Sequence, residues 1–370
     1  MSGETAAGIV SADLDAIVDG LEADLDRLAG RRLLVTGGAG FLGYELVQAA
    51  LRVNERGHEP VSVTVFDNFI RGVPEWMGEI EGNEHLRVVK HDIREPLPAD
   101  MDDFELVVHA AGIASPPYYR MHPIETMDAN VNGLRSLLEW SVGQQEQGRP
   151  VEGFLFFSSS EIYGDPDAAS IPTPETYRGN VSCTGPRACY DESKRYGETL
   201  CVNFARQYGV PARIARPFNN FGPGLKISDR RVIPDFARDL LAGRDLVMLS
   251  DGSATRTFCY VSDAVTGYYK VLLRGGDGEA YNVGVEEPEI SMRELGERLA
   301  GLGRSLFGYE GSVVLGESEE ADYLVDNPNR RCPVIAKARE ELGYAPRVDL
   351  DEGLRRTLVW YAENREAVDA

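Results

Sequence analysis

A glycine-rich turn between an apolar run and a helical pattern constrains this chain most strongly. The segment from Thr36 to Gly43 reads TGGAGFLG, and Gly37, Gly40 and Gly43 have the spacing GxxGxxG. Glycines at these positions allow a tight turn, let backbone N–H groups approach a pyrophosphate, and let the next helix pack close to the sheet. Because the turn follows a strand pattern and opens a helix pattern, it predicts the first βα unit of a dinucleotide-binding sheet.

Apolar runs alternate with helical stretches through residues 31–218. The runs LLVTG, VSVTVFDN, LRVVKHD, LVVHAAG and FLFFSSS lack polar alternation, which is typical of strands buried on both faces of a parallel sheet. Long helices are expected from Pro123 to about Glu146 and from Ala188 to Tyr208. The pattern predicts an α/β protein with a Rossmann-like, doubly wound parallel sheet.

Two further segments flank this predicted sheet. Residues 1–30 contain one amphipathic helix pattern, from Ser11 to Leu28, which we expect to pack on the domain or on a neighbouring subunit. After residue 218, Gly- and Pro-rich turns separate shorter helices and strands. We therefore expect residues 219–370 to form a smaller C-terminal lobe that closes over the nucleotide domain, with interleaved boundaries.

An acidic residue at the end of the second apolar run indicates which dinucleotide binds. The carboxylate of Asp67 can accept hydrogen bonds from both ribose hydroxyls of an adenosine, and it would repel a 2′-phosphate. This favours NAD over NADP. Asp92 and Ile93 follow the third apolar run and would lie near the adenine.

A tyrosine, a lysine and a serine cluster form the candidate chemical site. Tyr190 and Lys194 are four residues apart on a predicted helix, so they share a face. The serines of Ser158–Glu161 end the fifth apolar run, where doubly wound sheets place their sites. A neighbouring ammonium favours the phenolate of a tyrosine, which is otherwise a poor base at neutral pH. A serine hydroxyl can orient the alcohol that is being oxidised.

Composition excludes several classes of partner. The net charge is −22, so neither nucleic acid nor an anionic membrane is expected as the main partner. No apolar run approaches the roughly 20 residues that a membrane span needs, and the N-terminus lacks the pattern of a secretory signal. Five cysteines without CxxC spacing fit a reducing cytoplasm. The five histidines have no ligand spacing, so no metal site is expected.

Several longer stretches identify a family. GPRACYDESKR is the most specific, and SPPYYRMHPIET, SSSEIYGDP, RIARPFNNFGPG and TRTFCYVSDAV accompany it. Together with the glycine turn, Asp67, Asp92, Ser159, Tyr190 and Lys194, they resemble the extended short-chain dehydrogenase/reductases that act on nucleotide sugars. The resemblance extends from about residue 32 to the C-terminus, and it is strongest to the UDP-glucuronate decarboxylases of that family.

The resemblance implies NAD-dependent oxidation of UDP-glucuronate at C4, loss of CO2 from the 4-keto uronate, and re-reduction to UDP-xylose, with partial release of UDP-4-keto-xylose left open. Tyr190 would take the proton of the 4-hydroxyl group while Ser159 holds that hydroxyl. Glu161 would lie near the substrate carboxylate, so a cation must screen it, and Arg187 and Arg256 are the candidates. Arg256 is also the candidate for a role in decarboxylation or in protonation at C5.

The resemblance also assigns site residues. It implies catalytic roles for Ser159, Glu161, Tyr190, Lys194 and Arg256. It implies contacts with NAD from Gly37, Gly40, Phe41, Leu42, Asp67, Asn68, Asp92, Ile93, Ala111, Asn130, Tyr190 and Lys194. It implies contacts with a UDP-sugar substrate from Tyr119, Ser160, Glu161, Arg187, Asn219, Val232, Arg256 and Arg331.

Other functions stay open. A UDP- or TDP-sugar 4-epimerase is one, and a 4,6-dehydratase is another, although dehydratases carry an aspartic acid where Ser160 stands here. A non-catalytic protein that senses NAD or a nucleotide is the third, and the presence of Tyr190 and Lys194 disfavours it. The resemblance further implies a homodimer built through a four-helix bundle. The chain departs from the family at Ser182–Thr184 and at Gly224, which leaves open whether the ketone is reduced or released.

Overall fold

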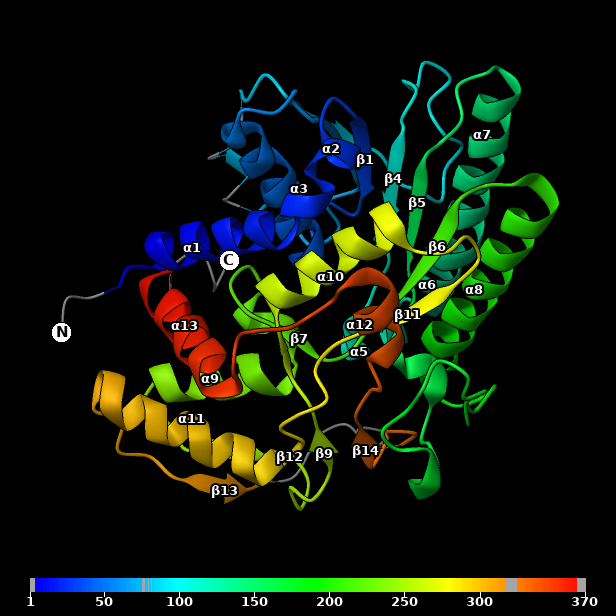
Figure 1. Cartoon of the computed structure of the whole chain (residues 1–370). Helices are drawn as coiled ribbons and strands as arrows, with labels where there is room; N and C mark the ends of the chain where they lie inside the picture. Colours follow the sequence, from blue (N-terminus) through cyan, green and yellow to red (C-terminus); the bar gives the residue numbers. More distant parts are fainter. Residues whose placement is uncertain (1–3, 75–76, 79, 81, 317–324, 365–370) are drawn as a thin grey trace.

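A seven-stranded parallel sheet forms the centre of the molecule (Figure 1). The structure is a computed structural model that describes residues 4–74, 77, 78, 80, 82–316 and 325–364. The strand order is β3-β2-β1-β4-β5-β6-β11, and this confirms the doubly wound parallel sheet predicted from the apolar runs. The strands are β1 (Arg32–Thr36), β2 (Ser62–Asp67), β3 (Leu86–Lys90), β4 (Leu106–His109), β5 (Gly153–Phe157), β6 (Ala212–Pro217) and β11 (Ala280–Val283).

Helices cover both faces of this sheet. On one face lie α3 (Phe41–Val53) and α10 (Val261–Arg274), and on the other α7 (Leu134–Glu146) and α8 (Ala188–Tyr208). Successive residues of a strand point to opposite faces, so Leu33 and Val35 join the core under α3, whereas Leu34 joins the core under α7. The helix predicted from Pro123 to Glu146 is continuous, but it contains α6 (Pro123–Asp128) and a π-helical turn (Ala129–Gly133) before α7.

The direction in which successive strands are added to the sheet reverses between β1 and β4. These two strands are neighbours in the sheet, although the chain passes from β1 to β2 and β3 before it reaches β4. Doubly wound sheets bind ligands in the crevice outside the carboxyl ends of such strands. The segments that follow β1, β4 and β5 therefore meet at this edge, together with α5 (Pro116–Met121) and the 3-10 turn Ser160–Tyr163.

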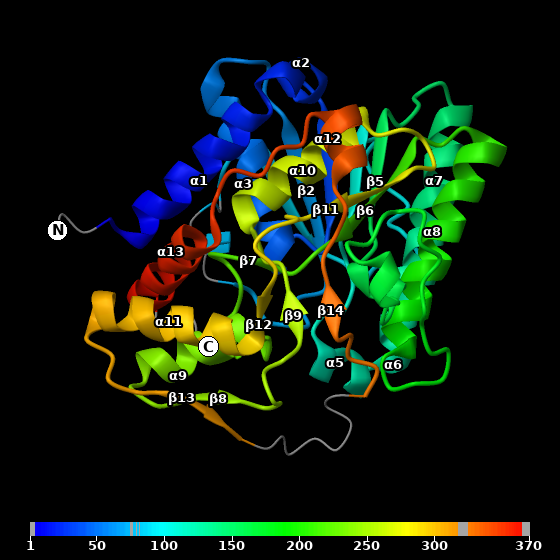
Figure 2. The same cartoon turned by 60° about the horizontal axis from the view of Figure 1, so that its bottom comes forward.

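A smaller group of elements lies below the carboxyl edge of the sheet (Figure 2). It contains α9 (Val232–Leu241), α11 (Met292–Phe307) and α13 (Leu350–Glu363). The paired strands are β7 (Asn220–Phe221) with β10 (Cys259–Tyr260), β8 (Leu246–Met248) with β13 (Val313–Leu315), and β9 (Thr255–Arg256) with β12 (Ile290–Ser291) and β14 (Arg330–Arg331). Residues 261–283 return to the main sheet as α10 and β11, and α12 (Ala336–Leu342) packs against both. The remaining 3-10 turns are Asn54–Arg56, Ala168–Ser170 and Ile227–Asp229.

The N-terminal helix packs on its own chain. The expected helix from Ser11 to Leu28 consists of α1 (Ala6–Gly20), a 3-10 turn (Glu22–Asp24) and α2 (Leu25–Leu28). It starts earlier than predicted because the Thr5 hydroxyl accepts a hydrogen bond from the Gly8 N–H (3.1 Å) and caps the helix. Helix α1 contacts α3, α10 and α13 (Figure 1). Of the helices that the structure describes, none combines the length and the apolar composition that crossing a membrane requires.

Candidate active site

The glycine turn after β1 leaves the start of α3 open to a ligand. Gly37 has a φ of +76°, and a Cβ atom there would lie 2.7 Å from the Ala111 backbone. A Cβ atom at Gly43 would lie 2.2 Å from the Gly37 carbonyl oxygen. Glycine is therefore required at both positions, and Gly40 caps α3 without a side-chain hydrogen bond. Free backbone N–H groups at a helix N-terminus suit a pyrophosphate.

The acidic residue predicted to bind ribose lies against this turn. The carboxylate of Asp67 accepts hydrogen bonds from the N–H groups of Ala39 (2.9 Å) and Phe69 (2.8 Å), and burial raises its pKa. Close by, the Asp92 carboxylate accepts a hydrogen bond from the Asn68 amide (3.0 Å). The Arg94 side chain holds the pKa of Asp92 well below its usual range. The second and third strands therefore bring these polar groups together, as the sequence predicted.

Asn130 and His109 are buried polar residues near the carboxyl edge of the sheet. Asn130 is fully buried in the π-helical turn, where its amide donates to the Ser193 hydroxyl (2.9 Å) and its Oδ1 atom has no hydrogen-bond partner among the described residues. His109 ends β4, and its Nδ1 lies 2.8 Å from the Thr36 hydroxyl. Burial lowers the pKa of His109 to about 3, so the ring is neutral. His109 was not predicted as a residue near the site, although its position at the end of a buried strand was a usable signal.

These features fit NAD. The open helix N-terminus suits its pyrophosphate, Asp67 suits the adenosine ribose, and the unpartnered amide oxygen of Asn130 offers a buried hydrogen-bond acceptor. Ile93 is buried against Gly133 of the π-helical turn. Ala111 lies against Gly37.

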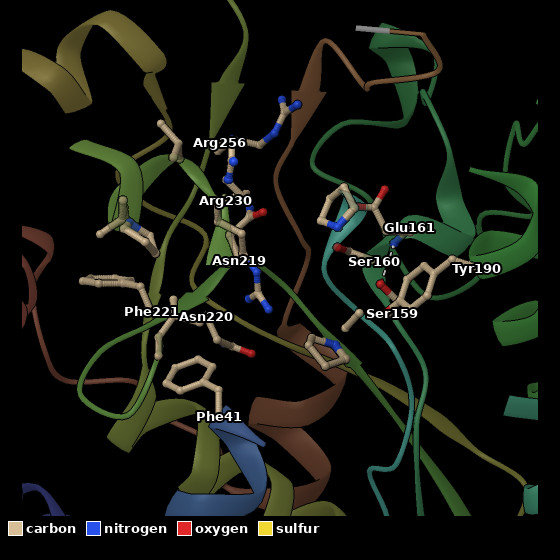
Figure 3. A pocket seen from close by; sticks show the side chains of 18 of the residues that line it. Phe41, Ser159, Ser160, Glu161, Tyr190, Asn219, Asn220, Phe221, Arg230 and Arg256 are labelled. Atoms are coloured by element: carbon tan, nitrogen blue, oxygen red, sulfur yellow. Dashed lines mark hydrogen bonds between the residues drawn. The ribbon is translucent and has the colours of Figure 1, made fainter. Parts of the chain in front are cut away.

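Tyr190, Ser159 and Lys194 meet beside the crevice, with the first two labelled in Figure 3. Tyr190 is hydrogen-bonded to Ser159, whose hydroxyl also accepts the Glu161 N–H (3.1 Å). The Lys194 ammonium donates to the Phe157 carbonyl oxygen (2.7 Å) and lies 5.7 Å from the centre of the Tyr190 ring. Burial raises the pKa of Tyr190 to about 12 and lowers the pKa of Lys194 to about 7. Tyr190 is protonated in this state and needs an added positive charge to act as a base.

Two arginines neutralise Glu161. Its Oε2 atom lies 2.6 Å from Nη2 of Arg187 and 2.6 Å from Nη2 of Arg331. Burial would raise the pKa of Glu161, but the two arginines outweigh it and lower the pKa to about 2. The sequence analysis named Arg187 and Arg256 as the screening cations. Arg187 holds this position, but Arg331 is the second partner, and the contact joins residues that are far apart in the sequence.

Arg256 lies across the crevice from Tyr190 (Figure 3). Its guanidinium donates to the carbonyl oxygens of Thr255 (2.7 Å), Asn329 (3.1 Å) and Pro328. Among the described residues, no carboxylate forms an ion pair with it, and burial, followed by the charge of Arg331, lowers its pKa to about 9. A buried guanidinium that bonds to backbone and amide oxygens, and to no carboxylate of the described residues, is suited to bind an anion.

One cavity of about 860 Å³ connects the glycine turn with the group around Tyr190, with Glu161 and with Arg256. The predicted residues that line it are Gly37, Gly40, Phe41, Leu42, Tyr119, Ser159, Ser160, Glu161, Arg187, Tyr190, Lys194, Asn219, Val232, Arg256 and Arg331. The predicted residues outside its lining are Asp67, Asn68, Asp92, Ile93, Ala111 and Asn130. Arg230 and Phe258 also line it and were not predicted. Phe258 lies in the stretch TRTFCYVSDAV, but no local pattern there marks it as facing a cavity. In the part of the chain that the structure describes, no cluster of three or more His, Cys, Asp or Glu side chains could hold a metal ion.

Comparison with known proteins identifies one family and several similar proteins. The model of the NAD dependent epimerase/dehydratase family matches residues 33–284. UDP-glucuronic acid decarboxylase 3 of Arabidopsis thaliana is 38% identical over 323 residues, which cover 87% of this chain and 86% of that protein. UDP-glucuronic acid decarboxylase 1 of Xenopus tropicalis is 37% identical over 342 residues, 91% of this chain and 73% of that protein. The crystal structure of a dTDP-glucose 4,6-dehydratase from Streptomyces venezuelae with NAD bound has a TM-score of 0.76 at 28% identity and covers 90% of this chain and 98% of its own.

Proposed function

This chain belongs to the NAD dependent epimerase/dehydratase family, and we propose that it decarboxylates UDP-glucuronate to UDP-xylose. The arginine-neutralised Glu161 beside Ser159 and Tyr190 carries this proposal. A bare glutamate at this position would repel the carboxylate of a uronic acid. With Arg187 and Arg331 on Glu161, and Arg256 on the facing wall, an anionic sugar can enter the site.

The nucleotide domain holds the cofactor. Gly37, Gly40, Phe41 and Leu42 would contact the pyrophosphate side of NAD, and Asp67 would bind the adenosine ribose. When bound there, NAD would supply the hydride acceptor for C4 of the sugar, and its positive nicotinamide would favour loss of the proton from Tyr190.

Three side chains handle the proton at the sugar 4-hydroxyl. Ser159 holds that hydroxyl, and Tyr190 accepts its proton as C4 becomes a ketone. Lys194 stabilises the resulting phenolate from its position over the same ring. The carboxylate at C6 is then β to a ketone, so CO2 leaves with the electron pair delocalised onto the C4 oxygen.

We place the nucleotide end of the substrate in residues 219–370. Arg256 and Asn219 would contact the diphosphate, and Val232 would pack on the uracil. Asn219 is held by hydrogen bonds from its amide to the Thr257 carbonyl oxygen (2.8 Å) and from Arg331 to its Oδ1 (3.4 Å). Tyr119 would contact the sugar from the other wall.

We also propose a cytoplasmic homodimer. All five cysteines are unpaired in the structure, which supports a reducing compartment. Helices α7 and α8 form a hollow of about 390 Å³ whose lining is half apolar or aromatic and half polar. The apolar and aromatic members are Val142, Tyr196, Leu200, Phe204 and Tyr208. Tyr196 and Tyr208 of α8 are exposed there, which supports pairing of α7 and α8 with a second copy. Gel filtration tests this, because a monomer at all concentrations would contradict it.

Mass spectrometry of the purified protein with UDP-glucuronate, with and without added NAD, tests the function. Loss of CO2 is expected, and the product mass distinguishes UDP-xylose from UDP-4-keto-pentose, which differ by two hydrogens. The Tyr190→Phe variant is the matched control and should show no product. An unchanged substrate mass with the unaltered protein would reject the proposal.

A further inference from the structure

The proposed reaction consumes a proton at each turnover. A carboxylate leaves as CO2 and a hydrogen takes its place at C5, so one proton must be supplied to that carbon. Tyr190 cannot supply it, because it returns the proton that it took from the 4-hydroxyl when the ketone is reduced. Glu161 cannot supply it either, because its pKa of about 2 leaves it ionised between two arginines. Arg256, the candidate from the sequence for this step, is a guanidinium that donates its N–H groups to three backbone carbonyl oxygens. The site therefore needs another acid.

Asp191 is a buried carboxyl group that the mechanism has not used. It follows Tyr190 on α8 and is only 4% exposed. Its Oδ2 atom lies 3.9 Å from Nε of Arg187, and its Oδ1 atom has no hydrogen-bond partner among the described residues. An unpaired buried carboxyl oxygen costs free energy. This cost suggests that Asp191 has a role besides stabilising the fold.

Tyr119 connects the surroundings of Asp191 to the cavity. Its ring stacks on that of Tyr190, with centroids 5.2 Å apart and an angle of 13° between the planes. Its hydroxyl is buried and also lacks a partner within the described structure, as does Nε of Arg187. Tyr119 lines the cavity and is electrostatically coupled to both Arg187 and Asp191. Two of these unpartnered atoms thus belong to residues that are electrostatically coupled to Arg187, and the third is Nε of Arg187 itself.

We propose that Asp191 and Tyr119 form a proton relay that protonates C5 after CO2 has left. This inference rests on the proposed decarboxylation. The C5–C6 bond breaks, and its electron pair forms the enolate of the C4 ketone. The enolate carbon C5 takes the proton of the Tyr119 hydroxyl, and the acid form of Asp191 restores that proton. Asp191 then regains a proton from solvent, so each turnover takes up one proton in all.

The charges around Asp191 allow it to hold a proton at neutral pH. Burial, followed by the charge of Glu161, raises its pKa to about 8, against the opposing effects of Arg187 and Arg331. Asp326 also faces it and raises the pKa. Burial raises the pKa of Tyr119 above its usual range, so that phenol is a hydrogen donor at rest. An acid must be protonated to donate, so we expect turnover to fall as pH rises through the pKa of Asp191.

The test compares the pH dependence of kcat in the unaltered protein and in Asp191→Asn. The variant keeps the shape of the side chain but cannot donate the proton. We expect its kcat at pH 7 to fall at least about 10-fold, and the decline at alkaline pH to disappear. Reduced cofactor should accumulate during turnover, seen by its absorbance, because the ketone that reoxidises it forms slowly. Tyr119→Phe should show the same pattern, and Asp191→Glu should restore part of the rate and the alkaline decline.

Two controls separate a relay from a structural role. Asp263→Asn changes another buried aspartate whose pKa burial raises, remote from the cavity lining, and it should leave the pH profile of kcat unchanged. Binding of UDP to Asp191→Asn, measured by calorimetry, should match that of the unaltered protein. An Asp191→Asn variant that keeps the full rate, or that keeps the alkaline decline while UDP binding weakens, would overturn the relay. Failure of the unaltered protein to release CO2 would instead overturn the proposed function.

Discussion

Two clusters of buried carboxyl groups in the described part of the chain differ in their position, because one lies at the wall of the cavity and the other does not line it. Around Glu161, two arginines contact one carboxylate, and Asp191 lies beside them. Beneath α1, Asp13 accepts hydrogen bonds from the Tyr260 hydroxyl (2.5 Å) and Arg356 (2.6 Å).

The second cluster is closed off from ligands. Glu45 of α3 is buried with an unpartnered Oε2 atom, and burial, together with the charge of Asp13, raises its pKa well above the usual value. Neither Asp13 nor Glu45 lines the cavity. Burial of an acid therefore does not mark a reactive site by itself. The Glu161 cluster is distinguished by excess positive charge and by its position next to Ser159 and Tyr190.

The largest expected contrast is between two tyrosines, one in each cluster. Tyr190→Phe removes the proposed base and should lower kcat with UDP-glucuronate by about 10²- to 10⁴-fold. Tyr260→Phe removes only the hydrogen bond to Asp13, so it should lower the free energy of unfolding by about 1 kcal/mol and leave kcat unchanged. Steady-state kinetics and denaturant unfolding check both. Equal loss of kcat in the two variants would abolish the distinction between the clusters.

A matched pair of glutamates gives the next contrast. Glu161→Gln leaves two buried guanidinium groups without their carboxylate, so the free energy of unfolding should fall by about 3–5 kcal/mol. Turnover should fall too. Burial raises the pKa of Glu45 well above its usual value, and Glu45→Gln gives a neutral side chain of the same shape, so both quantities should hardly change. A strongly destabilised Glu45→Gln variant would show that Glu45 is ionised in the folded protein.

Helix α1 should stabilise the fold without taking part in catalysis. Ile17 belongs to α1 and is fully buried. Ile17→Ala should lower the free energy of unfolding by about 2–5 kcal/mol. The kcat of the remaining folded protein should be unchanged. Denaturant titration and kinetics at low temperature measure the two effects separately. A loss of turnover without loss of stability would instead assign the helix a direct effect on the site.

The smallest effect is a pH dependence of stability from Asp13. Burial raises its pKa from 3.8 to about 6, against hydrogen bonds from Tyr260 and Arg356. Between these values the folded protein holds a proton that the unfolded chain has lost. Below pH 3.8, Asp13 thus contributes about 3 kcal/mol to the free energy of unfolding. This contribution is lost as pH rises through about 6. Unfolding measured from pH 4 to 7 should show a flatter pH dependence in Asp13→Asn, and an identical slope would contradict the assignment.

Local sequence patterns predicted much of the fold and one wall of the site. The strands appeared as apolar runs, and α8 has the predicted bounds because its amphipathic face is long and ends at Gly209, in the left-handed conformation. The glycine turn was recognisable because a side chain at Gly37 or Gly43 would collide with the backbone. Tyr190 and Lys194 share a face through helix geometry alone.

The sequence by itself therefore determined the parallel sheet, the dinucleotide turn and the Ser159–Tyr190–Lys194 group, since each depends on contacts within one or two neighbouring elements. Only the tertiary structure decided that Arg331, and not Arg256, contacts Glu161, and that Asp191 shares Arg187 with it. It also decided that α1 covers a second set of buried acids. Such contacts join residues far apart in the chain, and which of many similar charged side chains meet depends on how whole elements pack, which no local pattern records.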